Sequence, residues 1–244
     1  MFEWKLAVFD LDGVLTDTAM YHYLAWKQTL QERGIPVDEE VCELVKGISR
    51  AESLKLILKR AHVPLDEVIC TQLLSEKNDR YQDMIKKLSQ TDVLPGILPF
   101  LNELRMHGIV CVVASASQSA SMILEKLLIR KYFAGVVDPA SVRHGKPAPD
   151  IFLQACRMAH IPVEHAIGFE DARAGIQAMR RAGMKAIGIG HPQLQLEHPD
   201  VYYPDTSCLH MQAVCAGTEG EKPMILIFFI LFLPAILAVF LYST

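Results

Sequence analysis

The stretch Leu6-Ala7-Val8-Phe9-Asp10-Leu11-Asp12-Gly13, near the N-terminus, decides the fold. Four apolar residues followed directly by carboxylates and a glycine are typical of a buried strand that ends in a polar loop. Ligands of open parallel sheets bind at the carboxyl ends of the strands. The stretch therefore predicts a functional site at Asp10 and Asp12.

The second half of the chain alternates between strand and helix patterns. Apolar runs at 109–114, 135–137, 166–169, 185–189 and 201–203 are separated by helical patterns that end near residues 107, 130, 160 and 182. Such alternation predicts an α/β fold of the Rossmann type, with a parallel sheet covered by helices on both faces.

The segment between the first strand and this alternation contains only helical patterns, at 17–33, 39–46, 50–60 and 65–87. It predicts an all-helical insertion. The expected organisation is a discontinuous core of residues 1–16 and 92–206, with a helical cap of residues 17–91.

Composition excludes several classes of protein. The chain has 244 residues, is 51% hydrophobic and carries a net charge of −4, which excludes a disordered chain. It has no run of Lys and Arg, so we expect no nucleic-acid partner. Its six cysteines form no C-x-x-C pair and indicate reduced, cytoplasmic usage without a cysteine metal site.

The C-terminal end is unusual. A polar linker is predicted over 207–222, in place of a closing helix, and a hydrophobic tail over 223–244. Eighteen uncharged residues from Met224 to Leu241, interrupted by Pro234, are just long enough to span a bilayer. Two interpretations stay open: a membrane anchor, or an aberrant extension that replaces the usual end of the chain. We favour the extension slightly.

The residues at the predicted strand ends suggest phosphoryl transfer. They comprise four carboxylates, a hydroxyl and an amine: Asp10, Asp12, Glu170, Asp171, Ser115 and Lys146. Crowded carboxylates stay ionised beside a hard divalent cation, most plausibly Mg²⁺. One aspartate could then attack phosphorus while another moves a proton. The hydroxyl and the amine would hold phosphoryl oxygens.

Four motifs in order carry a resemblance to a known family. They are Phe9-Asp10-Leu11-Asp12-Gly13-Val14 with Thr16-Asp17-Thr18, Ala114-Ser115-Ala116-Ser117, Lys146-Pro147-Ala148-Pro149-Asp150, and Gly168-Phe169-Glu170-Asp171 with Gly175. One Asp-x-Asp also occurs in ordinary turns, but the ordered set resembles the haloacid dehalogenase superfamily. The insertion lies where the superfamily's helical C1 cap belongs.

Within the superfamily, residues 1–206 resemble the β-phosphoglucomutase family. The shared segments are Tyr21-His22, Trp26-Lys27, Gly47-Ile48-Ser49-Arg50, Lys77-Asn78-Asp79 and Pro95-Gly96-Ile97. The chain departs from that family at Gln118 and Ser119, where Lys and Asn are expected.

The resemblance implies roles for the core residues. Asp10 would be the phosphorylated nucleophile and Asp12 the general acid and base. Mg²⁺ would be held by Asp10, the Asp12 carbonyl, Glu170 and Asp171. The transferring phosphoryl group would be bound by Ser115, the Ala116 amide and Lys146.

It also implies roles for the cap and the hinge. Arg50, with Ser117 and Ser119, would hold the second phosphate of the substrate. His22 and Lys77 would sense cap closure. Trp26 and Gly47 count among the substrate-binding residues, although the spacing of Trp26 also fits the core of the cap. The hinge would lie at Thr16, Asp17 and Thr18.

The implied activity is a Mg²⁺-dependent phosphomutase. It would interconvert β-D-glucose 1-phosphate and D-glucose 6-phosphate through an aspartyl-phosphate enzyme and β-glucose 1,6-bisphosphate. A monomeric, cytoplasmic enzyme is expected, with a membrane partner only if the tail is a genuine anchor. The alternatives are a sugar-phosphate phosphatase on the same fold and a membrane-tethered protein with a vestigial site.

Overall fold

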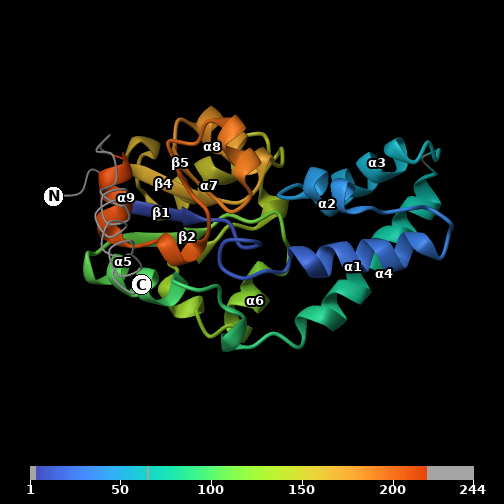
Figure 1. Ribbon diagram of the computed structural model, residues 1–244, viewed down its shortest axis with the longest axis horizontal. Helices are drawn as coiled ribbons and strands as arrows, with labels where there is room; N and C mark the ends of the chain where they lie inside the picture. Colours follow the sequence, from blue (N-terminus) through green and yellow to red (C-terminus); the bar gives the residue numbers. More distant parts are fainter. Residues whose placement is uncertain (1–3, 65, 219–244) are drawn as a thin grey trace, which may run out of the picture.

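The computed structural model describes residues 4–64 and 66–218 and consists of an α/β core and a helical cap (Figure 1). Within the described residues, six parallel strands form one sheet in the order β3-β2-β1-β4-β5-β6. The strands are β1 (Leu6–Phe9), β2 (Val110–Val113), β3 (Gly135–Val136), β4 (Ala166–Glu170), β5 (Lys185–Ile189) and β6 (Val201–Tyr203). This arrangement confirms the predicted α/β class.

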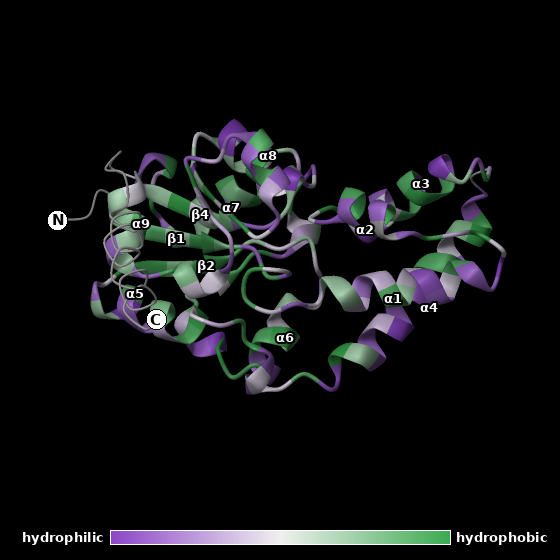
Figure 2. Ribbon diagram, viewed as in Figure 1, coloured by the Kyte–Doolittle hydropathy of each residue, from purple (hydrophilic) through white to green (hydrophobic). Residues whose placement is uncertain are grey.

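Alternate residues of each strand point to opposite faces of the sheet, and each face is covered by its own helices. In β1, Ala7 and Phe9 belong to the apolar cluster beneath α5 (Ile97–Met106) and α6 (Ala120–Lys126). Leu6 and Val8 belong instead to the cluster beneath α7 (Asp150–Ala159) and α8 (Arg173–Ala182). The central strands β1 and β2 are green, and so apolar, in Figure 2, as expected of strands buried on both faces.

The cap lies beyond the carboxyl ends of the strands, at the right of Figure 1. It comprises α1 (Ala19–Gln31), α2 (Glu39–Val45), α3 (Arg50–Arg60) and α4 (Glu67–Ile85). It has an apolar cluster of its own, with Trp26, Leu30 and Leu54 at its centre. Ser49 and Glu52 form a capping box that fixes the start of α3. The helix that carries Arg50 therefore begins at a defined position.

The C-terminal part of the core corrects one prediction. Helix α9 (Met211–Thr218) lies within 207–222, for which the sequence predicts a polar linker. Met211, Ala213 and Val214 are buried against α5 and β6. The Glu103 carboxylate accepts a hydrogen bond of 2.7 Å from the Met211 amide and so caps the helix from a distance of 108 residues along the chain. The core thus closes with a helix after all.

The hydrophobic tail predicted over 223–244 lies outside the described residues. Among residues 4–64 and 66–218, no helix has both the length and the apolar character needed to cross a bilayer.

Candidate active site

A buried lysine ties two carboxylates together at the end of the sheet. Asp10 follows β1, Glu170 ends β4, and Lys146 reaches both from the loop that precedes α7. Lys146 Nζ donates to Asp10 Oδ1 at 2.5 Å and to Glu170 Oε2 at 2.8 Å. Burial alone would lower the pKa of Lys146, but the two carboxylates outweigh it and raise that pKa above its usual value. Lys146 is therefore a fixed cation.

The carboxylates of Asp10, Glu170 and Asp171 offer oxygen atoms that all lie within 4.8 Å of one another. A side chain at either neighbouring glycine would collide with them. A Cβ at Gly13 would lie 2.1 Å from Asp171 Oδ2, and a Cβ at Gly175 would lie 1.8 Å from Glu170 Oε2. The backbone thus leaves room for a compact set of hard oxygen donors, which fits Mg²⁺.

Burial raises the pKa of Glu170 and of Asp171. The pKa of Glu170 rises to about 7 and that of Asp171 rises well above its usual value, first through burial and then through neighbouring carboxylates. The adjacent Lys146 opposes the rise at Glu170. Lys146, with Lys46 at 3.9 Å from Asp171, thus balances only part of the negative charge, and a divalent ion would complete the balance.

Asp12 lies next to Thr18, the residue before α1, and to His22 on α1. Thr18 Oγ1 donates to Asp12 Oδ1, and His22 Nε2 lies 3.7 Å from Asp12 Oδ2. The Nδ1 atom of His22 lies 2.6 Å from the Nζ of Lys77 on α4. Lys77 itself is buried above the rings of Trp26 and Tyr81. Polar contacts thus link Lys77 and His22 of the cap helices to the Asp12 carboxylate of the core.

The protonation states along this line follow from burial. The pKa of Lys77 falls to about 7, through burial and then through Arg50. The pKa of His22 falls well below its usual value, through burial and then through Lys77 and Arg50. A neutral His22 that accepts from Lys77 at Nδ1 carries its proton on Nε2, the atom that faces Asp12.

The pKa of Asp12 is also shifted. It rises to about 8, through burial and then through the charge of Asp10. At neutral pH the carboxyl group can therefore hold a proton and release it, as a general acid and base must.

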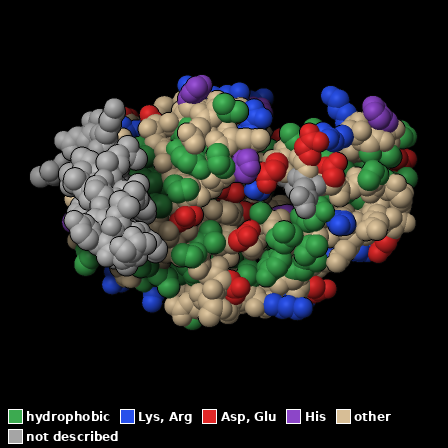
Figure 3. All heavy atoms as spheres, viewed as in Figure 1, with side chains coloured by type: hydrophobic (Ala, Val, Ile, Leu, Met, Phe, Trp, Pro, Cys, Tyr) green, Lys and Arg blue, Asp and Glu red, His purple; other side chains and the backbone are tan. Residues whose placement is uncertain are grey.

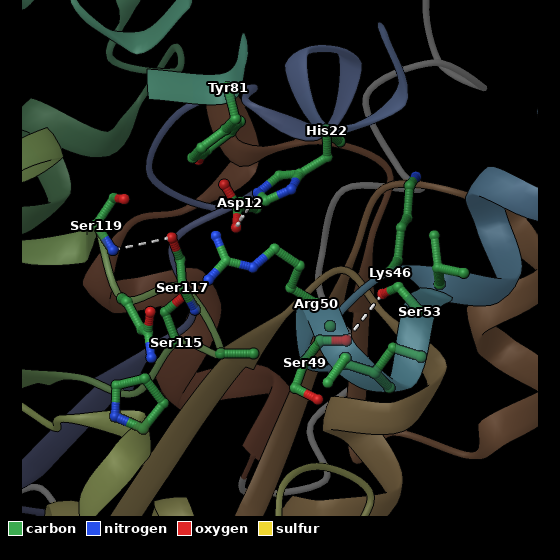
Figure 4. Close-up of a pocket in the computed structure, with 18 of the residues that line it drawn as sticks. Asp12, His22, Lys46, Ser49, Arg50, Ser53, Tyr81, Ser115, Ser117 and Ser119 are labelled. Atoms are coloured by element: carbon green, nitrogen blue, oxygen red, sulfur yellow. Dashed lines mark hydrogen bonds and ion pairs between the residues drawn. The ribbon is translucent and has the colours of Figure 1, made fainter. Parts of the chain in front are cut away.

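A cavity of about 300 Å³ lies between cap and core. The predicted residues that line it are Asp10, Asp12, His22, Trp26, Gly47, Arg50, Lys77, Ser115, Ala116, Ser117, Ser119 and Asp171. Figure 4 shows Arg50 reaching from α3 across this cavity toward Ser117 and Asp12. In the space-filling view, acidic side chains gather where the cap meets the core (Figure 3). The structure thus brings the cap and core candidates to one site.

The remaining predicted residues lie next to the cavity. Lys146 and Glu170 are buried just behind Asp10. Thr16 bridges the two connections between the domains, since it pairs with Val93 and donates to the Asp92 carbonyl at 2.7 Å. Asp17 is exposed and lines a second cavity, of about 480 Å³, on the other side of Asp171.

Sequence reasoning missed three neighbours of the site. Lys46 Nζ lies 3.9 Å from Asp171 Oδ2 and lines both cavities. The Tyr81 ring stacks on His22 with centroids 4.1 Å apart, and Gln82 donates to Ser119 Oγ at 2.7 Å. Tyr81 could have been found from its i, i+4 spacing to Lys77. The partner of Gln82 depends on how the cap docks, which no local pattern gives.

Comparison with known proteins identifies the family of the chain. A model of haloacid dehalogenase-like hydrolases matches residues 4–183. The chain is 44% identical to a β-phosphoglucomutase of Bacillus subtilis over 194 residues, 79% of this chain and 86% of that protein. It is 30% identical to a fructose-1-phosphate phosphatase of Escherichia coli over 182 residues, which are 75% of this chain and 94% of that protein.

A solved structure is similar as well. The crystal structure of β-phosphoglucomutase from Clostridium difficile matches with a TM-score of 0.85 and 33% identity, over 89% of this chain and 98% of that one. The family model covers most of the chain, and the aligned relatives agree with it. This chain belongs to the haloacid dehalogenase-like hydrolase family.

Proposed function

We propose that this protein is a phosphomutase that interconverts β-D-glucose 1-phosphate and D-glucose 6-phosphate through β-glucose 1,6-bisphosphate. The observation that carries the proposal is the shared cavity: the carboxylates of Asp10 and Asp12 face it from the core, and Arg50 faces it from the cap. A bisphosphate needs an anion site at both ends. The identity to β-phosphoglucomutases supports the choice of sugar.

Asp10, Glu170 and Asp171, with the Asp12 carbonyl, would hold Mg²⁺. The ion would offset carboxylate charge and polarise the transferring phosphoryl group. Lys146, the Ser115 hydroxyl and the Ala116 amide would hold the oxygens of that group. Preorganised donors of this kind stabilise the charge that develops during transfer.

The reaction needs two transfers at Asp10. Phosphorylated Asp10 first gives its phosphoryl group to the 6-hydroxyl of β-glucose 1-phosphate, and Asp12 takes the hydroxyl proton. The bisphosphate then turns around. The free Asp10 carboxylate attacks the phosphorus at C1, Asp12 returns the proton to the leaving O1, and glucose 6-phosphate is released. Asp10 is phosphorylated again, so the cycle balances.

The cap would separate transfer to sugar from transfer to water. Closure brings Arg50 onto the second phosphate beside Ser117 and Ser119, and it places His22 and Lys77 next to Asp12. Thr16, Asp17 and Thr18 would lie at the hinge. Because water is excluded while the cap is closed, the aspartyl phosphate survives until the next sugar binds.

A sugar-phosphate phosphatase is the second candidate. Two observations favour it: the 30% identity to a fructose-1-phosphate phosphatase, and the neutral side chains Gln118 and Ser119 at the second phosphate. A hydrolase needs only one phosphate site and passes the phosphoryl group to water.

The product ratio separates the two candidates. The full-length protein is incubated with β-glucose 1-phosphate, Mg²⁺ and a trace of the 1,6-bisphosphate, and glucose 6-phosphate and inorganic phosphate are measured together. If the protein is a mutase, we expect glucose 6-phosphate in large excess over inorganic phosphate. Inorganic phosphate equal to the substrate consumed would establish the phosphatase instead.

A further inference from the structure

A hydrogen bond between cap and core lies just behind the substrate cavity. Gln82 is on the last turn of α4, and its Nε2 donates to Ser119 Oγ at 2.7 Å. Ser119 lines the cavity, whereas Gln82 does not. Gln82 is half-buried.

Ser119 is the last of three serines at alternate positions of the loop that follows β2. The Ser117 amide donates to Ser115 Oγ at 3.1 Å, and the Ser119 amide donates to Ser117 Oγ at 3.3 Å. Figure 4 shows the second of these bonds beside Arg50. The first two hydroxyls are thus oriented by the backbone of their own loop. The third is oriented by the cap.

The direction of these bonds decides what each hydroxyl can still do. A serine hydroxyl has one donor and two acceptor positions. The bond from Gln82 uses an acceptor position of the Ser119 hydroxyl, which leaves its O–H free to donate. The cavity therefore presents a hydroxyl donor that suits phosphate oxygens, and Gln82 fixes its direction.

We infer that Gln82 is a positioning residue for substrate binding, because it aims the Ser119 hydroxyl at the second phosphate of the sugar bisphosphate. This rests on the proposed function. Gln82 acts only through Ser119 and only while cap and core are in contact. Gln82 therefore contributes to binding at the second phosphate. It does not contribute to the chemistry at Asp10, which lies in a different loop, the one after β1.

A double-mutant cycle tests the inference. Gln82→Met keeps the length of the side chain but has no donor, and Ser119→Ala removes the hydroxyl. Each variant should raise KM for β-glucose 1-phosphate about three- to tenfold with kcat nearly unchanged, the size expected of one net hydrogen bond. The double variant should be no worse than Ser119→Ala alone, because Gln82 has no other route to the substrate.

Gln82→Glu is a second variant, which tests the inference even if Gln82→Met unfolds. In Gln82→Glu the carboxylate can only accept, so the Ser119 hydroxyl turns away from the substrate to donate to it. KM should then rise at least as far as in Ser119→Ala. Thermal unfolding of every variant is measured alongside, so that loss of fold is recognised.

Lys126→Met is the matched control. Lys126 Nζ donates to the Lys86 carbonyl at 2.9 Å, another contact between α6 and α4 that does not involve Ser119. Its KM should be unchanged. Additive effects in the cycle, an unchanged KM in Gln82→Met and Gln82→Glu, or an equal rise in Lys126→Met would each overturn the inference.

Failure of the proposed function would be seen separately. The wild-type product ratio is read in the same assay. If inorganic phosphate is the product, the proposed mutase function fails by that result alone, whatever the KM values of the Gln82 and Ser119 variants.

Discussion

At the scale of single residues, the site is a set of buried charges that offset one another incompletely. Lys146 serves both Asp10 and Glu170, while Asp171 has only Lys46, 3.9 Å away, as a nearby cation in the described part of the chain. A buried carboxylate without full compensation costs stability. The metal-free protein should therefore be less stable at any pH where these acids ionise.

The sign of this pH dependence follows from the raised pKa values. Glu170, with a folded pKa of about 7, and Asp171, whose pKa is raised well above its usual value, bind protons more tightly in the folded than in the unfolded chain. Their stabilising contribution is complete below about pH 4, the unfolded pKa, and is lost as pH rises through the folded pKa. The melting temperature of the metal-free protein should fall by a few degrees between pH 5 and pH 7.5.

Asp171→Asn should reduce the fall in melting temperature of the metal-free protein between pH 5 and pH 7.5. Mg²⁺ should raise the melting temperature of the wild type most at pH 7.5 and leave the variant nearly unmoved, because binding to the folded state stabilises it. Asp83→Asn, at an exposed carboxylate on α4, is the control and should behave as the wild type. A variant that still responds fully to Mg²⁺ would contradict the assignment of Asp171 to the metal site.

Much of this residue set could be predicted from the sequence. Asp10, Ser115 and Glu170 follow or end apolar runs, and parallel strands bring such ends to one edge. The contacts between the domains could not be derived in this way. His22 and Lys77 lie 55 residues apart on two helices whose docking depends on tertiary packing. Their proximity was implied only by the family resemblance.

At the scale of elements, α9 shows where local pattern fails. Its eight residues include a glycine and a threonine, both weak helix formers, and have no clear apolar period. Burial against α5 and the bond from Met211 to Glu103 stabilise it instead. Helices this short owe their stability to packing. The local pattern therefore predicts a linker where the structure has a helix.

Val214 tests the packing of α9. Val214 is fully buried, so Val214→Asp would place an unpaired charge in the core and should lower the free energy of unfolding by at least about 3 kcal/mol. Gln212→Asp, on the exposed side of the same helix, should change it by less than about 0.5 kcal/mol. Chemical denaturation measures both. Equal stability of the two variants would show that α9 does not close the core.

At the scale of the whole molecule, the site exists only where the core and the cap meet. The core supplies the carboxylates, Lys146 and the serines, and the cap supplies Arg50, Lys77 and His22. Neither body alone encloses the cavity. In the proposed reaction the fate of a phosphoryl group on Asp10 would depend on the cap: a closed cap would deliver it to a sugar hydroxyl, and an open one would expose it to water.

Following that phosphoryl group for one turnover tests the central claim most directly. The Mg²⁺-bound protein is phosphorylated with labelled sugar bisphosphate, the labelled residue is mapped by mass spectrometry, and excess β-glucose 1-phosphate is added. We predict label on Asp10 that passes to the sugar and appears in glucose 1,6-bisphosphate and glucose 6-phosphate. Label on another residue, or label that leaves Asp10 only as inorganic phosphate, would contradict the account.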